Sequence, residues 1–352
     1  MSIGYLPRLD GVRCLAVLMV IAAHFASSLA KHISANFYGV NLFFVLSGFL
    51  ITTILLSDKV NNFKNSYLRF VLRRSLRIFP SYYLSIFIFY IFISDEMRSD
   101  LVYLLTYTYN YFIDDSKSLP THVFYWSLSV EEQFYLFFPL IVIPLKNNIK
   151  FLKVIFTLII IVSFLQVYFN LFGISKYNWV GLLTNMAPLT IGAFGALVNK
   201  NNKFIKLIFA NLYLEIILIS VLIFVLNTHI YKYMILFSSL INLYIILKAS
   251  IFYFQLNFIN TLLLNKHIRY IGKVSYGIYL YHGLVGKYSN KYIFQPIWDS
   301  IPFHKFPIFS FLYDWDWIFR FSLIVGLSVL IASISYNFFE IYFLKLKDRI
   351  KV

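Results

Sequence analysis

The sequence contains little charge and almost no cysteine. Of its 352 residues, 13% are charged, one is cysteine and 60% are hydrophobic. Soluble domains average about 25% charged and about 45–50% apolar residues, so this composition argues against both an ordinary soluble enzyme and a disordered chain. One cysteine excludes a disulfide scaffold and a cysteine-based metal cluster. Acidic residues are also scarce, 15 against 31 basic, which gives a net charge of +16.

Long apolar runs account for the composition. A helix needs about 20 mostly apolar residues to cross about 30 Å of hydrocarbon. No internal repeat or linker interrupts the runs, so we expect one all-α membrane domain over 1–352, without an appended soluble domain. We predict ten transmembrane helices, at 12–30, 37–56, 79–94, 123–145, 151–172, 179–198, 205–226, 233–254, 274–290 and 318–340.

The basic residues predict the orientation of these helices. The segment 101–113 is apolar but short and rich in Tyr, Thr and Asn, which suits an interfacial or re-entrant helix. If it does not cross, most lysines and arginines fall on one side of the membrane, and both termini are cytoplasmic. The charge of +16 then signals orientation, and no nucleic-acid partner is expected. An alternative for the first span is a cleavable signal peptide ending near 28–30.

Ionisable groups at membrane depth cost at least about 2.5–3.5 kcal/mol each and are candidate functional residues. The first span carries Arg13 and His24. A histidine near neutral pKa can serve as a base or a nucleophile. Two structural interpretations stay open, in which Arg13 anchors the inner end of the span and His24 bonds a neighbouring helix.

The fourth span carries the adjacent carboxylates Glu131 and Glu132. They point about 100° apart, so one partner cannot easily serve both, whereas Ser127 shares a helix face with Glu131. At 1.5 Å per residue, Glu131 and His24 both lie about 18 Å from the inner side. A carboxylate at that depth can orient the imidazole and stabilise its cation. The alternative is a polar contact between helices.

Arg69, Arg73, Arg74 and Arg77 precede Pro80 and form a basic helix face at the inner surface. Such a face can bind anionic lipid head groups. It can also bind the phosphates of a cytosolic cofactor, because arginine forms bidentate bonds with phosphate.

Weaker signals lie in other spans. Gly39 and Gly48 permit close helix packing, and Ser47 can bond a neighbour. A histidine at mid-span, His282, is by itself typical of a packing residue. Two other intramembrane carboxylates, Glu215 and Glu340, have no predicted role.

Five motifs occur in the order found in the membrane acyltransferase-3 family, which this sequence resembles. They are RLDGVRCLAVLMVIAAH, GVNLFFVLSGFLI, RRSLRIFPSYY, WSLSVEEQFY and VSYGIYLYH, and they extend from residue 8 to 282. The resemblance implies a bacterial inner-membrane enzyme that uses acetyl-CoA to O-acetylate surface or secreted glycans. One departure is Asn41, where many members carry Asp.

The resemblance also implies roles for individual residues. His24 is the essential histidine, acting as general base or through an acetyl-imidazole, and Glu131 or Glu132 orients it. No metal is expected, membrane lipids surround the chain, and the sequence does not define the oligomeric state. The predicted catalytic residues are His24, Glu131, Glu132, Arg13 and Ser127; the cofactor-binding residues are Arg73, Arg74, Arg77, Arg8 and Asp10; the substrate-binding residues are Trp126, Tyr135 and His282.

Two alternatives concern the activity. The chain could be a non-enzymatic transporter or flippase of lipid-linked glycans, since buried charges in many spans also suit transport. Within the enzyme class, the acceptor could be a glycan, a lipid-linked glycan, a small lipid or an antibiotic.

Overall fold

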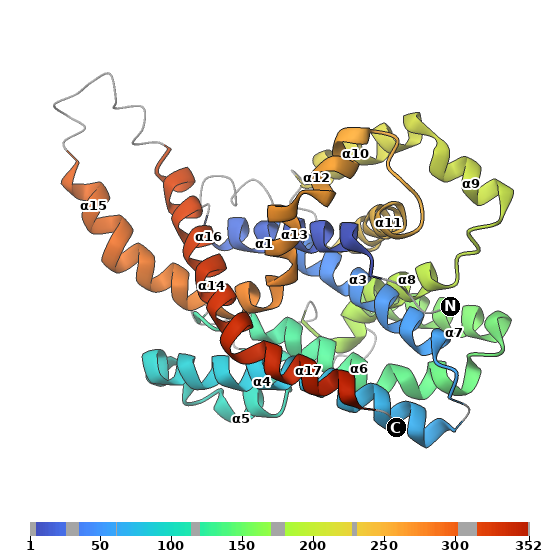
Figure 1. Ribbon diagram of the computed structural model, residues 1–352, viewed down its shortest axis with the longest axis horizontal. Helices are drawn as coiled ribbons and strands as arrows, with labels where there is room; N and C mark the ends of the chain where they lie inside the picture. The colour runs from blue at the N-terminus through green and yellow to red at the C-terminus, as the bar shows by residue number, and fades with distance from the viewer. Residues whose placement is uncertain are drawn as a thin grey trace.

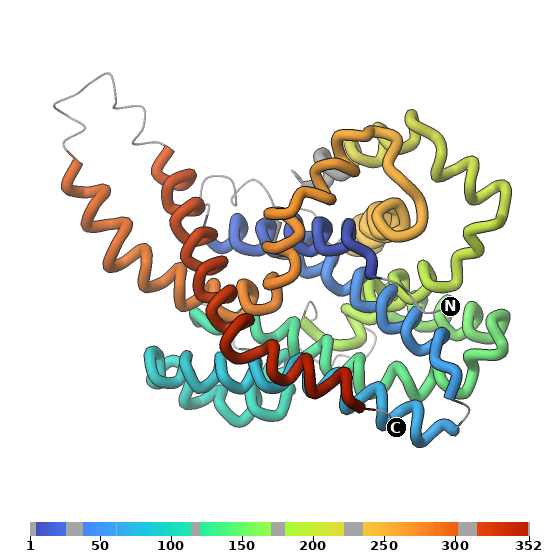
Figure 2. The backbone as a smooth tube through the Cα atoms, viewed as in Figure 1, coloured from blue at the N-terminus to red at the C-terminus, as the bar shows by residue number. Residues whose placement is uncertain are grey.

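The computed structural model describes residues 5–25, 35–60, 62–113, 120–169, 180–226, 231–301 and 315–350, which form helices without any strand (Figures 1 and 2). The helices are α1 (Pro7–Phe25), α3 (Ala35–Ser57), α4 (Phe63–Met97), α5 (Leu101–Leu105), η1 (Tyr109–Tyr111), α6 (Tyr125–Leu145), α7 (Ile149–Phe169), α8 (Leu182–Ala196), α9 (Lys203–Ala210), α10 (Leu212–Leu226), α11 (Tyr231–Ser250), α12 (Asn257–Leu264), α13 (Lys266–Lys273), α14 (Ser275–Ser289), η2 (Asn290–Phe294), α15 (Gln295–Ser300), α16 (Asp316–Ser335), η5 (Tyr336–Glu340) and α17 (Ile341–Arg349).

Each of the ten predicted ranges contains a helix, and the all-α fold is confirmed. Within the described residues, five helices are long and apolar enough to cross a membrane. A sixth is added if α9 and α10, which meet at 62°, form one bent span. The count of ten and the cytoplasmic termini therefore stay predictions.

The ambiguous segment 101–113 folds back against the bundle. It contains a five-residue helix and a three-residue helix, and five residues rise only about 7.5 Å, too little to cross. Tyr107, between the two helices, has a positive φ of 54°. Its ring stacks on Tyr82 at 4.2 Å between centroids, and its carbonyl accepts from Gln133 Nε2 at 2.7 Å. These contacts hold the segment against α4 and α6.

Close packing of α3 and α8 depends on two glycines. A Cβ built at Gly48 would lie 1.8 Å from the Leu189 carbonyl oxygen, and one at Gly192 would lie 1.9 Å from that of Val45. Each helix therefore places a glycine against the backbone of the other. This agrees with the packing role predicted for Gly48 and brings α3 into the centre of the bundle.

Two buried polar contacts join α11 to its neighbours α3 and α10. Asn41 exchanges side-chain hydrogen bonds with Ser239 and Asn242 of α11, at 2.9 and 2.8 Å. Glu215 and Lys248 are fully buried and pair at 2.6 Å. The carboxylate also accepts two backbone N–H groups and the ammonium donates to two carbonyls, so this pair is fully bonded. Glu215 thus has a structural partner that the sequence did not indicate.

Long helix α4 positions the basic residues. Its backbone leaves helical geometry at Ile93, and the 30 residues before that kink rise about 45 Å, more than an apolar core of about 30 Å requires, so its first turns can extend beyond the core. Near the C-terminus α17 lies across α4, while α14 packs beside α16 (Figure 1). The first half of α4 is therefore covered by a helix from the other end of the chain.

Candidate active site

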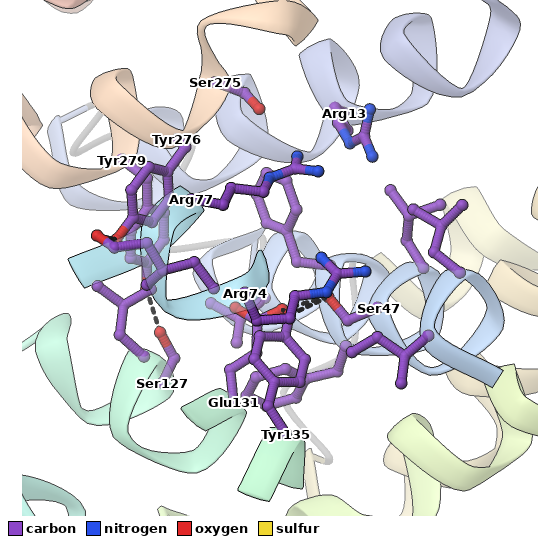
Figure 3. Close-up of a pocket in the computed structure, with 18 of the residues that line it drawn as sticks. Arg13, Ser47, Arg74, Arg77, Ser127, Glu131, Tyr135, Ser275, Tyr276 and Tyr279 are labelled. Carbon is purple, nitrogen blue, oxygen red and sulfur yellow. Dashed lines mark hydrogen bonds between the residues drawn. The ribbon is translucent and has the colours of Figure 1, made fainter. Parts of the chain in front are cut away.

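An inner cavity opens among α1, α3, α4, α6, α13 and α14. It contains about 920 Å³ of empty space, its open mouth included. Three guanidinium groups, from Arg13, Arg74 and Arg77, point into this space (Figure 3). The polar residues that line the inner cavity are Arg13, Ser47, Arg74, Arg77, Ser127, Glu131, Tyr135, Lys273, Ser275, Tyr276 and Tyr279.

Glu131 has two hydrogen-bond donors within the inner cavity. The hydroxyls of Ser47 and Tyr135 both donate to its Oε1 atom. The tyrosine lies one turn along α6, whereas the serine comes from α3. Arg74 lies against the ring of Tyr135, with 5.5 Å between the guanidinium carbon and the ring centroid. The carboxylate therefore links α3 to α6 beside a cation from α4 (Figure 3).

Ser127 connects the same cavity to α14. Its Oγ lies 2.5 Å from the Tyr279 hydroxyl, which also donates to the Phe124 carbonyl at 3.1 Å. The Tyr279 carbonyl in turn lies 2.7 Å from Nδ1 of His282. Since a carbonyl only accepts, this nitrogen carries the proton, and Nε2 of a neutral His282 is left as an acceptor.

His24 lies beside His282 and outside the lining of the inner cavity. The two ring centroids are 5.3 Å apart, and Phe25 and Phe124 also contact the His282 ring. His282 is 1% exposed, whereas His24, in the last turn of α1, is exposed. The two histidines thus extend from Tyr279, which lines the inner cavity, to the surface of the protein at His24.

The structure does not bring His24 and Glu131 together as we expected. Among the described residues, Glu131 accepts hydrogen bonds from Ser47 and Tyr135, and the rings beside His24 are those of His282 and Phe25. Glu132 does not replace Glu131, because its buried Oε1 has no hydrogen-bond partner within the described part of the chain. Depth along the membrane normal is only one coordinate, and it does not determine which side of the bundle a residue faces.

A second opening, the basic pocket, lies where α17 crosses α4. It has about 880 Å³ of empty space and shares Arg74 and Arg77 with the inner cavity. Arg73 is 44% exposed here and lies 3.9 Å from Asp348. The polar residues that line the basic pocket are Ser57, Asp58, Ser66, Arg69, Arg73, Arg74, Arg77 and Lys347.

The remaining predicted residues have supporting positions. Asp10 pairs with Arg13 at 2.6 Å and so holds that guanidinium at the inner cavity. Arg8 stacks over Tyr253 at 3.8 Å and lines neither opening. Trp126 is 6% exposed and packs edge-on against a phenylalanine of α3.

The sequence did not indicate several of the residues that line these openings, among them Tyr276, Tyr279 and Lys347. Tyr279 and Tyr276 were quoted only as part of a motif, and both line the inner cavity. Lys347 was not singled out from the other basic residues of the sequence, and it lines the basic pocket. The tyrosine-rich motif that ends in a histidine could have indicated Tyr276 and Tyr279. A count of charges could not have indicated Lys347, because it does not distinguish a lysine that anchors a helix from one that binds a ligand.

Comparison with known proteins identifies the family of the chain. A family model described as an acyltransferase domain matches residues 6–337, so the chain belongs to this acyltransferase family. A peptidoglycan O-acetyltransferase, OatA, of Listeria monocytogenes is 30% identical over 79% of this chain and 49% of its own length. The O-acetyltransferase OatA of Staphylococcus aureus is 28% identical over 96% of this chain and 57% of its own.

The chain spans about half the length of these curated relatives. A putative O-acetyltransferase of Staphylococcus aureus strain COL shows the same proportion, with 27% identity over 97% of this chain and 58% of that protein. No solved structure matches the chain.

Proposed function

We propose that the chain is a multi-pass membrane O-acyltransferase of the bacterial inner membrane. In this proposal it transfers the acetyl group of cytosolic acetyl-CoA to a hydroxyl of a glycan on the outer side. The family membership supports acyl transfer, and the relatives named as O-acetyltransferases support an acetyl group. The name of the Listeria relative supports a glycan, free or lipid-linked, as the acceptor class.

One observation carries the donor side of the proposal: the basic pocket and the inner cavity share Arg74 and Arg77. CoA joins a highly anionic nucleotide to a long, neutral pantetheine arm that ends in the thioester. Arginine clusters suit the phosphates, because guanidinium forms bidentate, charge-assisted bonds with them. The arm would extend from the shared arginines into the inner cavity and carry the thioester toward Tyr279 and the histidine pair.

In one route, His24 acts as a general base. The acceptor oxygen forms a bond to the thioester carbonyl carbon while its proton passes to the imidazole. The carbon–sulfur bond breaks, and the thiolate takes the proton, which yields an O-acetyl ester and CoA thiol. His282 lies beside His24 and would fix the position of that ring.

In the other route, His24 is the nucleophile. Its nitrogen takes the acetyl group as CoA thiolate leaves, and the acceptor hydroxyl then attacks the acetyl-imidazole and restores the histidine. This route would let the acyl group reach the outer side without movement of CoA. Rapid-quench labelling with [¹⁴C]acetyl-CoA separates the routes, since only the second labels the protein.

The donor site is tested by neutralising the shared arginines. Arg77→Gln should raise the KM for acetyl-CoA by about tenfold or more, because it removes a charged phosphate contact. Lys64→Gln, in the first turns of the same helix and outside both openings, is the matched control. An unchanged KM in Arg77→Gln, with Arg74→Gln also unaffected, would contradict the donor site.

The acceptor is tested in the host. NMR spectra of the surface glycan, with and without this gene, should differ by O-acetyl signals at one sugar position. Identical spectra, together with labelled acetyl groups in the lipid extract, would instead identify a lipid acceptor.

A further inference from the structure

The basic pocket holds more positive charge than its carboxylates neutralise. Arg69 pairs with Asp58 at 3.5 Å, and both Arg73 and Lys347 lie near Asp348, at 3.9 and 3.6 Å. Asp348 is 68% exposed, so water screens much of its attraction.

The two deeper cations, Arg74 and Arg77, lie beside this cluster. Glu131 and Glu132 are near Arg74, and Glu340 is near Arg77, but no carboxylate within the described residues forms an ion pair with either guanidinium. Like charges gathered in one pocket repel each other unless an anion binds among them. The number of cations therefore indicates a ligand with more than one phosphate.

Position divides these cations into two groups. Arg74 and Arg77 line both the inner cavity and the basic pocket, whereas Arg73 and Lys347 line the basic pocket alone. In CoA the pyrophosphate follows the pantetheine arm directly, and the 3′-phosphate lies farther out on the ribose. An arm in the inner cavity would place the pyrophosphate at the shared pair and the 3′-phosphate at the outer pair.

We propose that Lys347, together with Arg73, binds the 3′-phosphate of CoA, so that α17 forms part of the donor site. This inference rests on the proposed function and names a contact that the arginine-rich motif of α4 does not contain. Its physical basis is the path of the chain: the π-helical turn η5 leads into α17, which lies across α4 (Figure 1). Lys347 thereby reaches a pocket formed by residues far away in the sequence.

A matched control lies two residues away on the same helix. Lys345 is exposed and does not line the basic pocket, whereas 24% of the Lys347 side chain is exposed. Both lysines contribute equally to the positive charge of the inner side. Comparing Lys347→Gln with Lys345→Gln therefore separates a phosphate contact from general attraction of the anionic donor to a basic surface.

The experiment measures the KM of full-length protein for acetyl-CoA and for 3′-dephospho-acetyl-CoA. The unmodified protein should prefer acetyl-CoA by about tenfold, the effect of one charge-assisted phosphate contact. Lys347→Gln should lose most of this preference by weakening acetyl-CoA alone, and Lys345→Gln should keep it. Arg73→Gln, aimed at the same phosphate from α4, should also lose it and replaces Lys347→Gln if that variant does not fold.

The outcomes separate this inference from the proposed function. If Lys347→Gln and Arg73→Gln retain the full preference, or if Lys345→Gln loses as much, the 3′-phosphate assignment is wrong. The binding of labelled acetyl-CoA and of labelled 3′-dephospho-acetyl-CoA to the unmodified protein is also measured at equilibrium. If the protein binds neither compound, the proposed function itself fails. If the unmodified protein binds both donors tightly and equally well, only the 3′-phosphate assignment to Lys347 and Arg73 is wrong, and the proposed function stands.

Discussion

The imidazole rings of His24 and His282 lie with their centroids 5.3 Å apart, in the last turn of α1 and in the middle of α14. Nδ1 of His282 is held by the Tyr279 carbonyl at 2.7 Å. Its ring therefore has a fixed orientation, with Nε2 as the acceptor. A neutral acceptor beside His24 can orient that ring as a carboxylate does in other enzymes, without adding a buried charge.

Replacing His282 should affect turnover more than donor binding. We expect His282→Ala to lower kcat by about 10–100-fold, the size of effect seen when a residue that orients a metal-bound histidine is removed. The KM for acetyl-CoA should stay within about twofold, because the proposed phosphate contacts lie at the basic pocket. Steady-state kinetics test this, with the exposed His267→Ala as control. A raised KM with unchanged kcat would assign His282 to binding and not to positioning.

The bonds of Glu131 should couple α3 to α6. Ser47→Ala and Tyr135→Phe each remove one donor to the same carboxylate oxygen, so their effects on stability should not add. We expect an interaction energy of about 0.5–3 kcal/mol in a double-mutant cycle. Unfolding in mixed micelles with increasing denaturant gives the four stabilities. Additive effects would mean that the two hydroxyls act independently.

The buried pair Glu215–Lys248 should stabilise the fold without contributing to transfer. Removing one partner leaves a buried charge, and we expect Glu215→Ala or Lys248→Ala to cost about 3–5 kcal/mol of unfolding free energy. Glu215→Gln combined with Lys248→Met should cost less than the two alanine effects added together. The surviving folded fraction should retain the KM for acetyl-CoA. A single variant as stable as the unmodified protein contradicts this assignment.

The close crossing of α3 and α8 leaves no room for a side chain at Gly48. A Cβ there would lie 1.8 Å from the Leu189 carbonyl, so even Gly48→Ala must separate the helices. We expect a strong loss of folded protein, measured by size-exclusion chromatography of extracted membranes. Gly326→Ala is the control, because nothing lies within 4 Å of a Cβ at that position. Equal yields of the two variants would contradict the close crossing.

Much of the fold could be predicted from local sequence. Apolar runs placed a helix in all ten ranges, because the hydrocarbon core requires length and apolarity that a sequence shows directly. The short segment 101–113 was separated from the spans by length and composition, and its helices are indeed too short to cross. The bend of 62° between α9 and α10 could not be predicted from hydropathy, because the residues on both sides of the bend are apolar.

The candidate site could be predicted only in part. Ionisable residues at membrane depth indicated Arg13 and Glu131, and the basic helix face indicated Arg74 and Arg77. All four line the inner cavity. The expected contact between Glu131 and His24 used depth alone, and depth does not say which side of a bundle a residue faces. The partner of Asn41 and that of His24 come from helices more than 150 residues away, and no local pattern encodes such contacts.

The most direct test of the account is acetyl transfer by membranes that contain equal amounts of the unmodified protein or of His24→Ala. With acetyl-labelled acetyl-CoA and the host glycan, both released CoA thiol and ester-linked label are measured. The account predicts one thiol released for each ester formed by the unmodified protein and neither product above background with His24→Ala. Equal rates for the two proteins would contradict it.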